Sequence, residues 1–252
     1  MEKELILNGL LVHTYFKKSL EKSKGKVLLL HGWGVSASIF DSLVEFLTKE
    51  NFDVYLIDFP GFGESPAPKT PLVLESYSLL VKEFIEKEIK EETIVLAHSF
   101  GGRVAIKLAS NFPQLIKKLV LIDSAGFVRK GLKNTLIKIF AKIFKPLFKL
   151  QVLSSLKIKV YKKIGTEDYL SNLELKKTYA NIVKEDLTEE MKKISVETII
   201  IWGKSDKTTP LEWGKKMHQL IKNSIFYEIK GGHFCFLDNS SEFNFILKNI
   251  LG

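Results

Sequence analysis

The sequence predicts an α/β protein in which a mostly parallel, doubly wound sheet carries helices on both faces. Short, continuously apolar runs alternate along the chain with longer segments of helical periodicity. Continuous apolarity is typical of strands buried on both faces, and parallel strands need the crossover connections that helices supply. Polar and glycine-rich segments follow most of these runs. Because ligands of such sheets bind beyond the carboxyl ends of the strands, we expect the functional side chains there.

The expected elements follow in order from the N-terminus. Residues 5–7 and 10–12 flank Asn8-Gly9, a dipeptide that readily takes the backbone angles of a two-residue turn, so the chain should open with an antiparallel hairpin. Six further apolar runs are expected to form strands, at 26–30, 52–57, 93–96, 119–122, 198–201 and 225–227. Segments with helical periodicity should supply crossovers and a final helix, at 39–49, 74–90 and 243–251.

The composition is that of a folded globular protein. Of 252 residues, 45% are hydrophobic and 27% are charged, which suits one large domain or a domain carrying an insertion. No apolar run approaches the roughly 18 residues of a membrane span, and no export signal is visible. The single cysteine, Cys235, excludes an intramolecular disulfide and a multi-cysteine metal site. From these features we expect a cytoplasmic protein.

The net charge of +9 is concentrated in one part of the chain. Between Gly126 and Asp186 there are 14 Lys or Arg residues and 5 Asp or Glu residues, whereas the remainder holds 24 of each sign. From Gly126 to Lys163 there are 11 basic residues and no acidic ones. This break in composition predicts an insertion with a surface role of its own.

Ser99 follows the apolar run 93–96 and has small residues on both sides. Ala97 precedes it by two positions, and Gly101 and Gly102 follow. A strand that turns into a helix at one residue holds that residue in a strained conformation with its side chain exposed above the sheet, which only small neighbours permit. The pattern favours a nucleophilic serine. The alternative is that Ser99 only caps the helix, since serine is a favoured N-cap residue.

A nucleophilic serine needs a base within hydrogen-bond reach. His98 precedes Ser99 directly and should point to the other face of the strand, because neighbouring side chains on a strand alternate. His233 follows the last predicted strand on a loop that contains Gly231 and Gly232. These glycines let the imidazole lean over the edge of the sheet, so His233 is the predicted base.

The base in turn needs an orienting carboxylate. Asp206 follows the penultimate strand and precedes a turn-rich segment at 208–210 that can aim a carboxylate inward. Asp123, which follows the strand before that, is the alternative, although it can also cap the next segment. We favour Asp206, which gives the chain order Ser99, Asp206, His233.

From Lys26 to Ser124 and from Glu197 to Leu251, the chain resembles members of the α/β-hydrolase fold superfamily, with the oxyanion loop, the serine turn, the acid and the histidine in sequence. The resemblance implies that the backbone N–H groups of Trp33 and Phe100 form the oxyanion hole.

Within that superfamily, the segments His-Gly-Trp-Gly at 31–34 and Phe-Pro-Gly-Phe-Gly at 59–63 are most similar to the carboxylesterase branch, which includes the methyl ester esterases of biotin synthesis. Those esterases carry Gly-Trp-Ser-Leu-Gly-Gly where this chain has Ala-His-Ser-Phe-Gly-Gly at 97–102. The carbon–carbon hydrolases carry asparagine before the serine and tryptophan after the histidine, where this chain has His98 and Phe234.

The resemblance also implies a helical cap at 126–190, inserted into a core made of 1–125 and 191–252. Its predicted helix has an apolar side and a basic side, kinked or divided at Pro146. The apolar side carries Leu136, Phe140, Ile143, Leu147 and Leu150, and the basic side carries Lys138, Lys142, Lys145 and Lys149.

We interpret this segment as an amphipathic lid over the site with solvated lysines. Two alternatives stay open, an acidic carrier protein or an anionic membrane surface docked on the lysines, and both predict salt-sensitive binding. Nucleic acid is disfavoured, because no base-stacking array or groove-reading motif accompanies the charge.

These observations predict a serine hydrolase that cleaves small-molecule carboxylic esters of small to medium acyl chains through an acyl-enzyme, with no metal or organic cofactor. In one alternative, the same triad cleaves a carbon–carbon bond or runs a lyase step on a carboxylated substrate that Arg103 could bind. In the other, the chain is a ligand-sensing binding protein with little turnover.

Overall fold

The computed structural model describes residues 1–128 and 173–252, whose strands form one sheet in the order β1-β2-β4-β3-β5-β6-β7-β8. The strands are β1 (Glu2–Leu7), β2 (Leu10–Lys17), β3 (Lys26–Leu30), β4 (Asp53–Ile57), β5 (Thr93–His98), β6 (Ile116–Ile122), β7 (Thr198–Gly203) and β8 (Ser224–Ile229). β2 pairs antiparallel with β1 and β4, and all other neighbouring strands run parallel. The predicted fold class, a mostly parallel sheet with an antiparallel start, is confirmed.

The described helices lie between and after these strands. They are α1 (Asp41–Lys49), α2 (Leu74–Phe84), α3 (Phe100–Asn111), α7 (Leu173–Ile182), α8 (Thr188–Lys193), α9 (Leu211–Leu220), α10 (Cys235–Asp238) and α11 (Ser240–Leu251). The helix expected at 74–90 consists of α2 and a π-helical turn, η2 (Ile85–Ile89), which ends where Lys90 takes a left-handed conformation at φ 64°. None of the described helices is long and apolar enough to cross a membrane.

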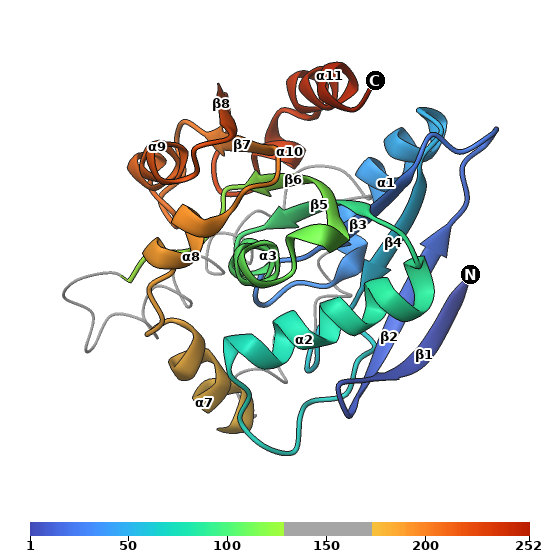
Figure 1. The fold of residues 1–252 in the computed structure, drawn as a ribbon, viewed down its shortest axis with the longest axis vertical. Coiled ribbons are helices and arrows are strands. Elements are labelled where there is room, and N and C mark those ends of the chain that lie inside the picture. The colour runs from blue at the N-terminus through green and yellow to red at the C-terminus, as the bar shows by residue number, and fades with distance from the viewer. Residues whose placement is uncertain (129–172) are drawn as a thin grey trace, which may run out of the picture.

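Helices cover both faces of the sheet (Figure 1). Residues of α2, α3, α8 and α9 pack on one face, and residues of α1, α10 and α11 pack on the other. Within β5, Val95 and Ala97 face the first layer, and Ile94 and Leu96 face the second. The strand is continuously apolar because both of its faces are buried.

The predicted cap at 126–190 is described at 126–128 and 173–190 only. The apolar stripe from Leu136 to Leu150, the lysines between its members and most of the basic insertion lie outside the described residues. The described part, α7 and the start of α8, packs against the first helical layer through Leu175, Ile182 and Leu187, which are buried in the same core cluster as α2 and α3.

Candidate active site

Ser99 lies at the turn between β5 and α3 in a backbone conformation that is rare for a residue with a side chain, with φ 52° and ψ −109°. The turn is held by hydrogen bonds from the Ser99 N–H to the Ile122 carbonyl at 3.1 Å and from the Gly102 N–H to the Ser99 carbonyl at 3.1 Å. A Cβ atom at Gly101 would collide with the carbonyl oxygen of Leu30 on β3. The small residue therefore lets α3 approach the sheet closely enough to form the turn.

The structure brings His233 to Ser99. The Nε2 atom of His233 lies 2.9 Å from the Ser99 Oγ atom, although the two residues are 134 positions apart in the chain. His233 follows β8 and its side chain is 12% exposed, so the imidazole is largely buried at the carboxyl edge of the sheet and keeps a small opening to solvent. This distance is within reach for proton transfer between the hydroxyl and the imidazole.

Asp206 completes the arrangement on the other side of the imidazole. Its Oδ2 atom lies 2.8 Å from His233 Nδ1, and the carboxylate is buried. Oδ1 accepts hydrogen bonds from the Thr208 N–H at 2.7 Å and the Thr209 N–H at 3.0 Å. The Thr209 hydroxyl donates to Oδ2 at 2.6 Å.

Two opposing effects set the protonation of Asp206. Burial alone would raise the pKa of Asp206, but the hydrogen bonds with His233 and Thr209 outweigh it and lower the pKa. Asp206 is therefore ionised at neutral pH and can hold the Nδ1–H tautomer of His233, which leaves Nε2 free to accept the serine proton.

Asp123, the alternative acid, has a different set of contacts. It is fully buried after β6, where Oδ1 accepts from the Gly203 N–H at 2.8 Å and Oδ2 accepts from the Cys235 N–H at 3.2 Å. Burial raises the pKa of Asp123 to about 6. Asp123 thus connects the end of β7 to the loop that carries His233, and Asp206 is the aspartate whose carboxylate contacts the imidazole.

The loop that carries Trp33 is fixed by His31, which follows β3. His31 Nδ1 donates to the Gly32 carbonyl at 2.7 Å, and Nε2 accepts from the Phe59 N–H at 2.9 Å. Burial lowers the pKa of His31, consistent with the neutral ring that this pair of bonds requires. The rings of Trp33 and Phe100 lie 5.2 Å apart edge to face, so the two predicted oxyanion residues are neighbours.

Phe100 is the first residue of α3, and the first backbone N–H groups of a helix have no acceptor within it. In this geometry, the backbone N–H of Phe100 can donate a hydrogen bond to a ligand oxygen beside Ser99.

The loop after β4 also contributes to the site by supporting the Trp33 ring. The buried Asp58 carboxylate accepts from the Ala37 N–H at 2.7 Å, the Tyr15 hydroxyl at 2.8 Å and the Glu64 N–H at 2.9 Å. These bonds fix the segment that places Phe62 against Trp33, with ring centres 4.9 Å apart.

The helix α7 lies over this aromatic group. The rings of Tyr179 and Trp33 are 5.2 Å apart, and a Cβ atom at Gly61 would collide with Leu175. The Leu72 N–H donates to the Thr178 hydroxyl at 2.9 Å. Sequence reasoning did not identify Tyr179, because its apolar environment comes from loops more than 100 residues earlier in the chain.

Arg103 does not line the site in the way that a substrate-binding arginine would. It is 3% exposed, and its guanidinium donates to the Ile182 carbonyl at 2.9 Å and to the Glu185 carbonyl. Burial lowers its pKa to about 10, so it stays charged at neutral pH. Arg103 therefore ties the C-terminal end of α7 to α3.

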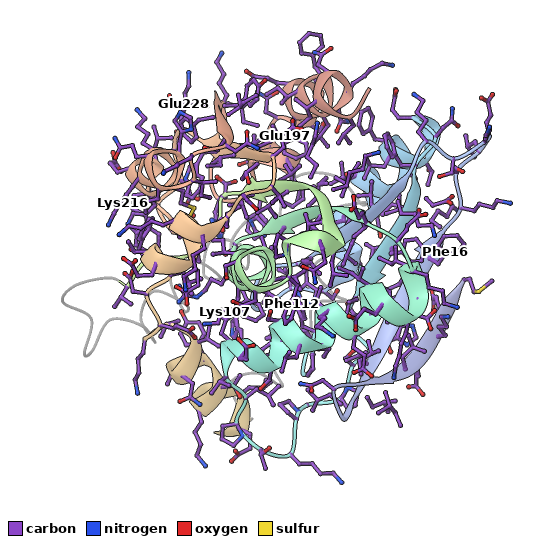
Figure 2. All side chains as sticks on the ribbon, in the orientation of Figure 1. Phe16, Lys107, Phe112, Glu197, Lys216 and Glu228 are labelled. Atoms are coloured by element: carbon purple, nitrogen blue, oxygen red, sulfur yellow. The ribbon has the colours of Figure 1, made fainter. Side chains whose placement is uncertain are left out.

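Lys107, which is labelled in Figure 2, lies one turn further along α3 and adds ion pairs to Glu185 at 2.6 Å and to Glu190 at 3.1 Å. The segment between α7 and α8 is thus attached to the helix that begins at the Ser99 turn.

Two further features concern ligands. Within residues 1–128 and 173–252, no group of three or more His, Cys, Asp or Glu side chains could hold a metal ion.

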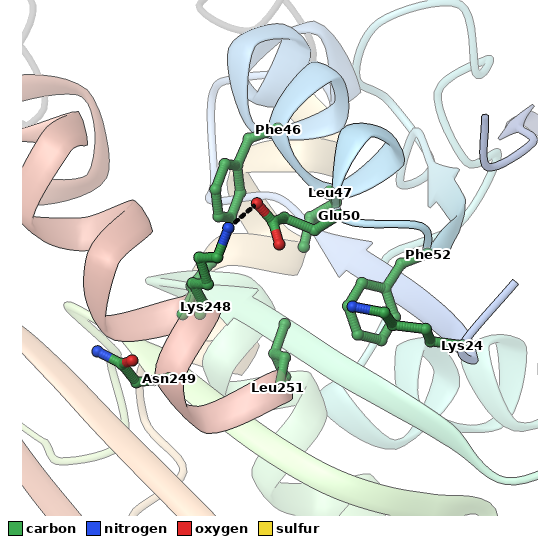
Figure 3. Close-up of a pocket in the computed structure, with 10 residues that line it drawn as sticks. Lys24, Phe46, Leu47, Glu50, Phe52, Lys248, Asn249 and Leu251 are labelled. Atoms are coloured by element: carbon green, nitrogen blue, oxygen red, sulfur yellow. Dashed lines mark hydrogen bonds and ion pairs between the residues drawn. The ribbon is translucent and has the colours of Figure 1, made fainter. Parts of the chain in front are cut away.

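A cavity of about 310 Å³ lies between the ends of α1 and α11, lined by Phe46, Phe52 and Leu251 with an ion pair of Lys248 and Glu50 at its rim (Figure 3). Because Phe52 precedes β4, this cavity is at the amino edge of the parallel strands, opposite Ser99.

Comparison with known proteins agrees with this architecture. A family model described as the alpha/beta hydrolase fold matches residues 26–157, which is more than half of the chain. The chain therefore belongs to the alpha/beta hydrolase fold family, and the resemblance drawn from the sequence is confirmed.

Relatives and solved structures extend over nearly the whole chain. The pimeloyl-[acyl-carrier protein] methyl ester esterase of Neisseria meningitidis is 24% identical over 247 residues, covering 90% of this chain and 77% of the esterase. A 2-hydroxy-6-oxononadienedioate/2-hydroxy-6-oxononatrienedioate hydrolase of Pseudomonas putida is 26% identical over 256 residues, covering 91% of this chain and 89% of that enzyme. The esterase from Exiguobacterium antarcticum superposes with a TM-score of 0.86 at 23% identity, covering 100% of this chain and 99% of that structure.

Proposed function

We propose that this hydrolase is a serine esterase that cleaves carboxylic esters of small to medium acyl chains. The observation that supports this proposal best is the continuous set of contacts from Ser99 Oγ to His233 Nε2, at 2.9 Å, and from His233 Nδ1 to Asp206 Oδ2, at 2.8 Å. A serine hydroxyl hydrogen-bonded to an imidazole, which is oriented by a buried carboxylate, is the arrangement that acyl transfer requires.

In the proposed reaction, Ser99 Oγ attacks the ester carbonyl carbon while His233 Nε2 takes the hydroxyl proton. Asp206 stabilises the imidazolium that results, and the N–H groups of Trp33 and Phe100 hold the oxyanion, each contributing about 3 kcal/mol to the transition state. The imidazolium then gives its proton to the departing alcohol, which leaves an acyl group on Ser99. Water, deprotonated by His233, releases the acid and restores the serine.

The surroundings of Ser99 favour an apolar acyl group. The rings of Phe62, Phe100 and Tyr179 each contact the ring of Trp33, and this aromatic wall lies next to the turn at Ser99. Such a group of rings can bury an alkyl chain. Among the described residues nearby, Arg103 donates to the carbonyls of Ile182 and Glu185 rather than facing a substrate carboxylate. We also propose that 126–190 forms a cap on the core made of 1–125 and 191–252, and that this cap contributes Tyr179 to the aromatic wall.

Hydrolysis of p-nitrophenyl acetate and butyrate by wild type and by Ser99→Ala tests the ester proposal. We expect saturable release of p-nitrophenolate by wild type and a loss in kcat of about 10⁴-fold or more in Ser99→Ala, since removal of the nucleophile disables both half-reactions. Equal turnover by the two proteins would contradict the proposal.

The second candidate function is hydrolysis of a carbon–carbon bond with the same three residues, which the Pseudomonas putida relative supports. Dienoic ketoacids added to the ester panel distinguish the two functions. A kcat/KM for a ketoacid above that for every ester would favour the second function. Saturable ligand binding with negligible turnover of the whole panel would favour a sensing role instead.

A further inference from the structure

His98, the residue before the proposed nucleophile, makes a contact that the reaction described above does not use. Its Nε2 atom lies 2.7 Å from the backbone carbonyl oxygen of His233. The two residues are 135 positions apart, and His98 is 1% exposed. His98, the residue adjacent to the proposed nucleophile, is therefore hydrogen-bonded to the backbone of the proposed base, His233.

The direction of this hydrogen bond fixes the state of the His98 ring. A carbonyl oxygen can only accept, so Nε2 of His98 carries a proton and donates it. Burial lowers the pKa of His98 to about 3, with a further contribution from the neighbouring His233 ring. The ring is thus neutral at the pH of catalysis, and no second positive charge lies beside the His233 imidazolium when it forms.

The His98 ring is held in place on several sides. It packs against the rings of Phe234 and Phe236, with centres 5.0 Å and 5.2 Å away, and against His233 itself at 4.8 Å. A Cβ atom at Gly32 would lie 2.9 Å from His98 Nδ1. Glycine at position 32 therefore gives the ring its room, and His98 also contacts the loop that carries Trp33.

The loop from Gly231 to Cys235 is held by hydrogen bonds to residues that follow the neighbouring strands β7 and β6. The Ser205 N–H donates to the Gly231 carbonyl at 2.9 Å, and the Cys235 N–H donates to Asp123 at 3.2 Å. Between these two bonds, His98 supplies the contact at His233, the residue whose ring must stay within hydrogen-bond distance of Ser99.

We propose that His98 is a positioning residue that sets the distance between Ser99 and His233 by donating its Nε2–H to the His233 carbonyl. The inference rests on the proposed function, because it assigns His98 a role in the same reaction. We assign this role to the Nε2–H donor of His98 rather than to its ring. A side chain that supplies a donor at this point should therefore preserve catalysis, and one of equal size without a donor should not.

The test compares His98→Gln with His98→Met, which are similar in length and shape and both uncharged, but differ in the amide donor. For His98→Met we expect kcat to fall about 10- to 100-fold with KM within about threefold of wild type, since small misplacements of reacting groups have effects of this size. For His98→Gln we expect kcat within about fivefold of wild type. The measurement uses p-nitrophenyl butyrate and, in parallel, the rate at which a fluorophosphonate modifies Ser99.

Leu47→Ala is the matched control, because Leu47 lies on α1 and is buried in the same core cluster as Phe236. It should lower Tm and leave kcat unchanged, which separates loss of stability from loss of positioning. If His98→Met does not fold, His98→Phe supplies the donor-free variant with an aromatic ring.

Equal kcat and labelling rate in His98→Gln, His98→Met and wild type would overturn the inference, and so would equal losses in both variants. Failure of the proposed function is a separate result. If the wild-type protein hydrolyses no ester, the labelling rates alone still compare the two His98 variants, because labelling requires only Ser99 and its base.

Discussion

Ser99 has a positive φ although it is not glycine. A conformation of this kind costs on the order of 1–3 kcal/mol and persists only where the surroundings enforce it. Here β5 is paired with β3 and β6, and α3 packs directly on the strand that it follows. The strained turn exposes the Ser99 hydroxyl at the sheet edge, where the His233 imidazole reaches it.

The two aspartates near His233 should respond differently to the same substitution. Asp206→Asn is expected to lower kcat by about 10³- to 10⁴-fold, because the amide favours the wrong tautomer of His233. Asp123→Asn leaves one of two buried N–H groups without an acceptor, so it should cost about 1–3 kcal/mol of stability while kcat stays within about tenfold. Steady-state kinetics and urea denaturation of both variants measure these effects. A larger kcat loss in Asp123→Asn than in Asp206→Asn would reassign the acid.

The pKa shifts of Asp206 and Asp123 change the free energy of unfolding in opposite directions as pH rises. Folding lowers the pKa of Asp206, so its ionised form contributes stability that is present above its ordinary pKa of about 3.9 and lost as pH falls through the folded value. Folding raises the pKa of Asp123 to about 6, so its contribution declines as pH rises from about 4 to about 6. The difference in unfolding free energy between wild type and Asp206→Asn should therefore shrink below about pH 4.

Sequence alone predicted which side chains gather at the sheet edge, and the structure places Ser99, His233 and Asp206 together there. Position after a strand of the parallel sheet was the signal that pointed to these three. Asp123 also follows a strand, and only the direction of its side chain toward two backbone N–H groups separates it from Asp206. Because side chains alternate along a strand, we did not expect His98 to be the base. That reasoning gave no sign of the contact between His98 and the His233 backbone.

At the scale of elements, α3 connects the turn at Ser99 to α7. Arg103 and Lys107 both lie on α3 and both bind the segment that follows α7, but Arg103 does so from a buried position. Since α7 holds Tyr179 against Trp33, the attachment of this helix sets the aromatic wall next to Ser99.

Arg103→Met should loosen α7 without changing the turn at Ser99. It keeps the apolar stem and removes the donors to two carbonyls, which should cost about 1–3 kcal/mol of stability and speed amide exchange in α7. Lys107→Met, which removes partly exposed ion pairs, should cost about 1 kcal/mol or less. Hydrogen exchange measured by mass spectrometry tests both variants. If α7 in Arg103→Met exchanged as slowly as in wild type, Arg103 would not be its anchor.

At the scale of the whole molecule, six of the eight strands of the described sheet were expected from continuous apolarity, and β1 and β2 were expected from the Asn8-Gly9 turn between them. That signal is strong because a strand buried on both faces has no polar side to obscure it. The contacts of α7 with the loops after β3 and β4 could not be predicted in this way, because they join segments that share no periodicity and lie far apart in the chain. The fold thus follows from local patterns, whereas the wall of the site depends on tertiary packing.

We propose that this fold makes Ser99 a nucleophile through His233 and Asp206. The most direct measurement is peptide mass spectrometry of the folded protein after treatment with a fluorophosphonate, which reacts only with an activated serine. We expect a single adduct on Ser99 that is absent in Ser99→Ala and forms far more slowly in Asp206→Asn. A folded wild-type protein with Ser99 unmodified, or an adduct that persists in Ser99→Ala, would contradict it.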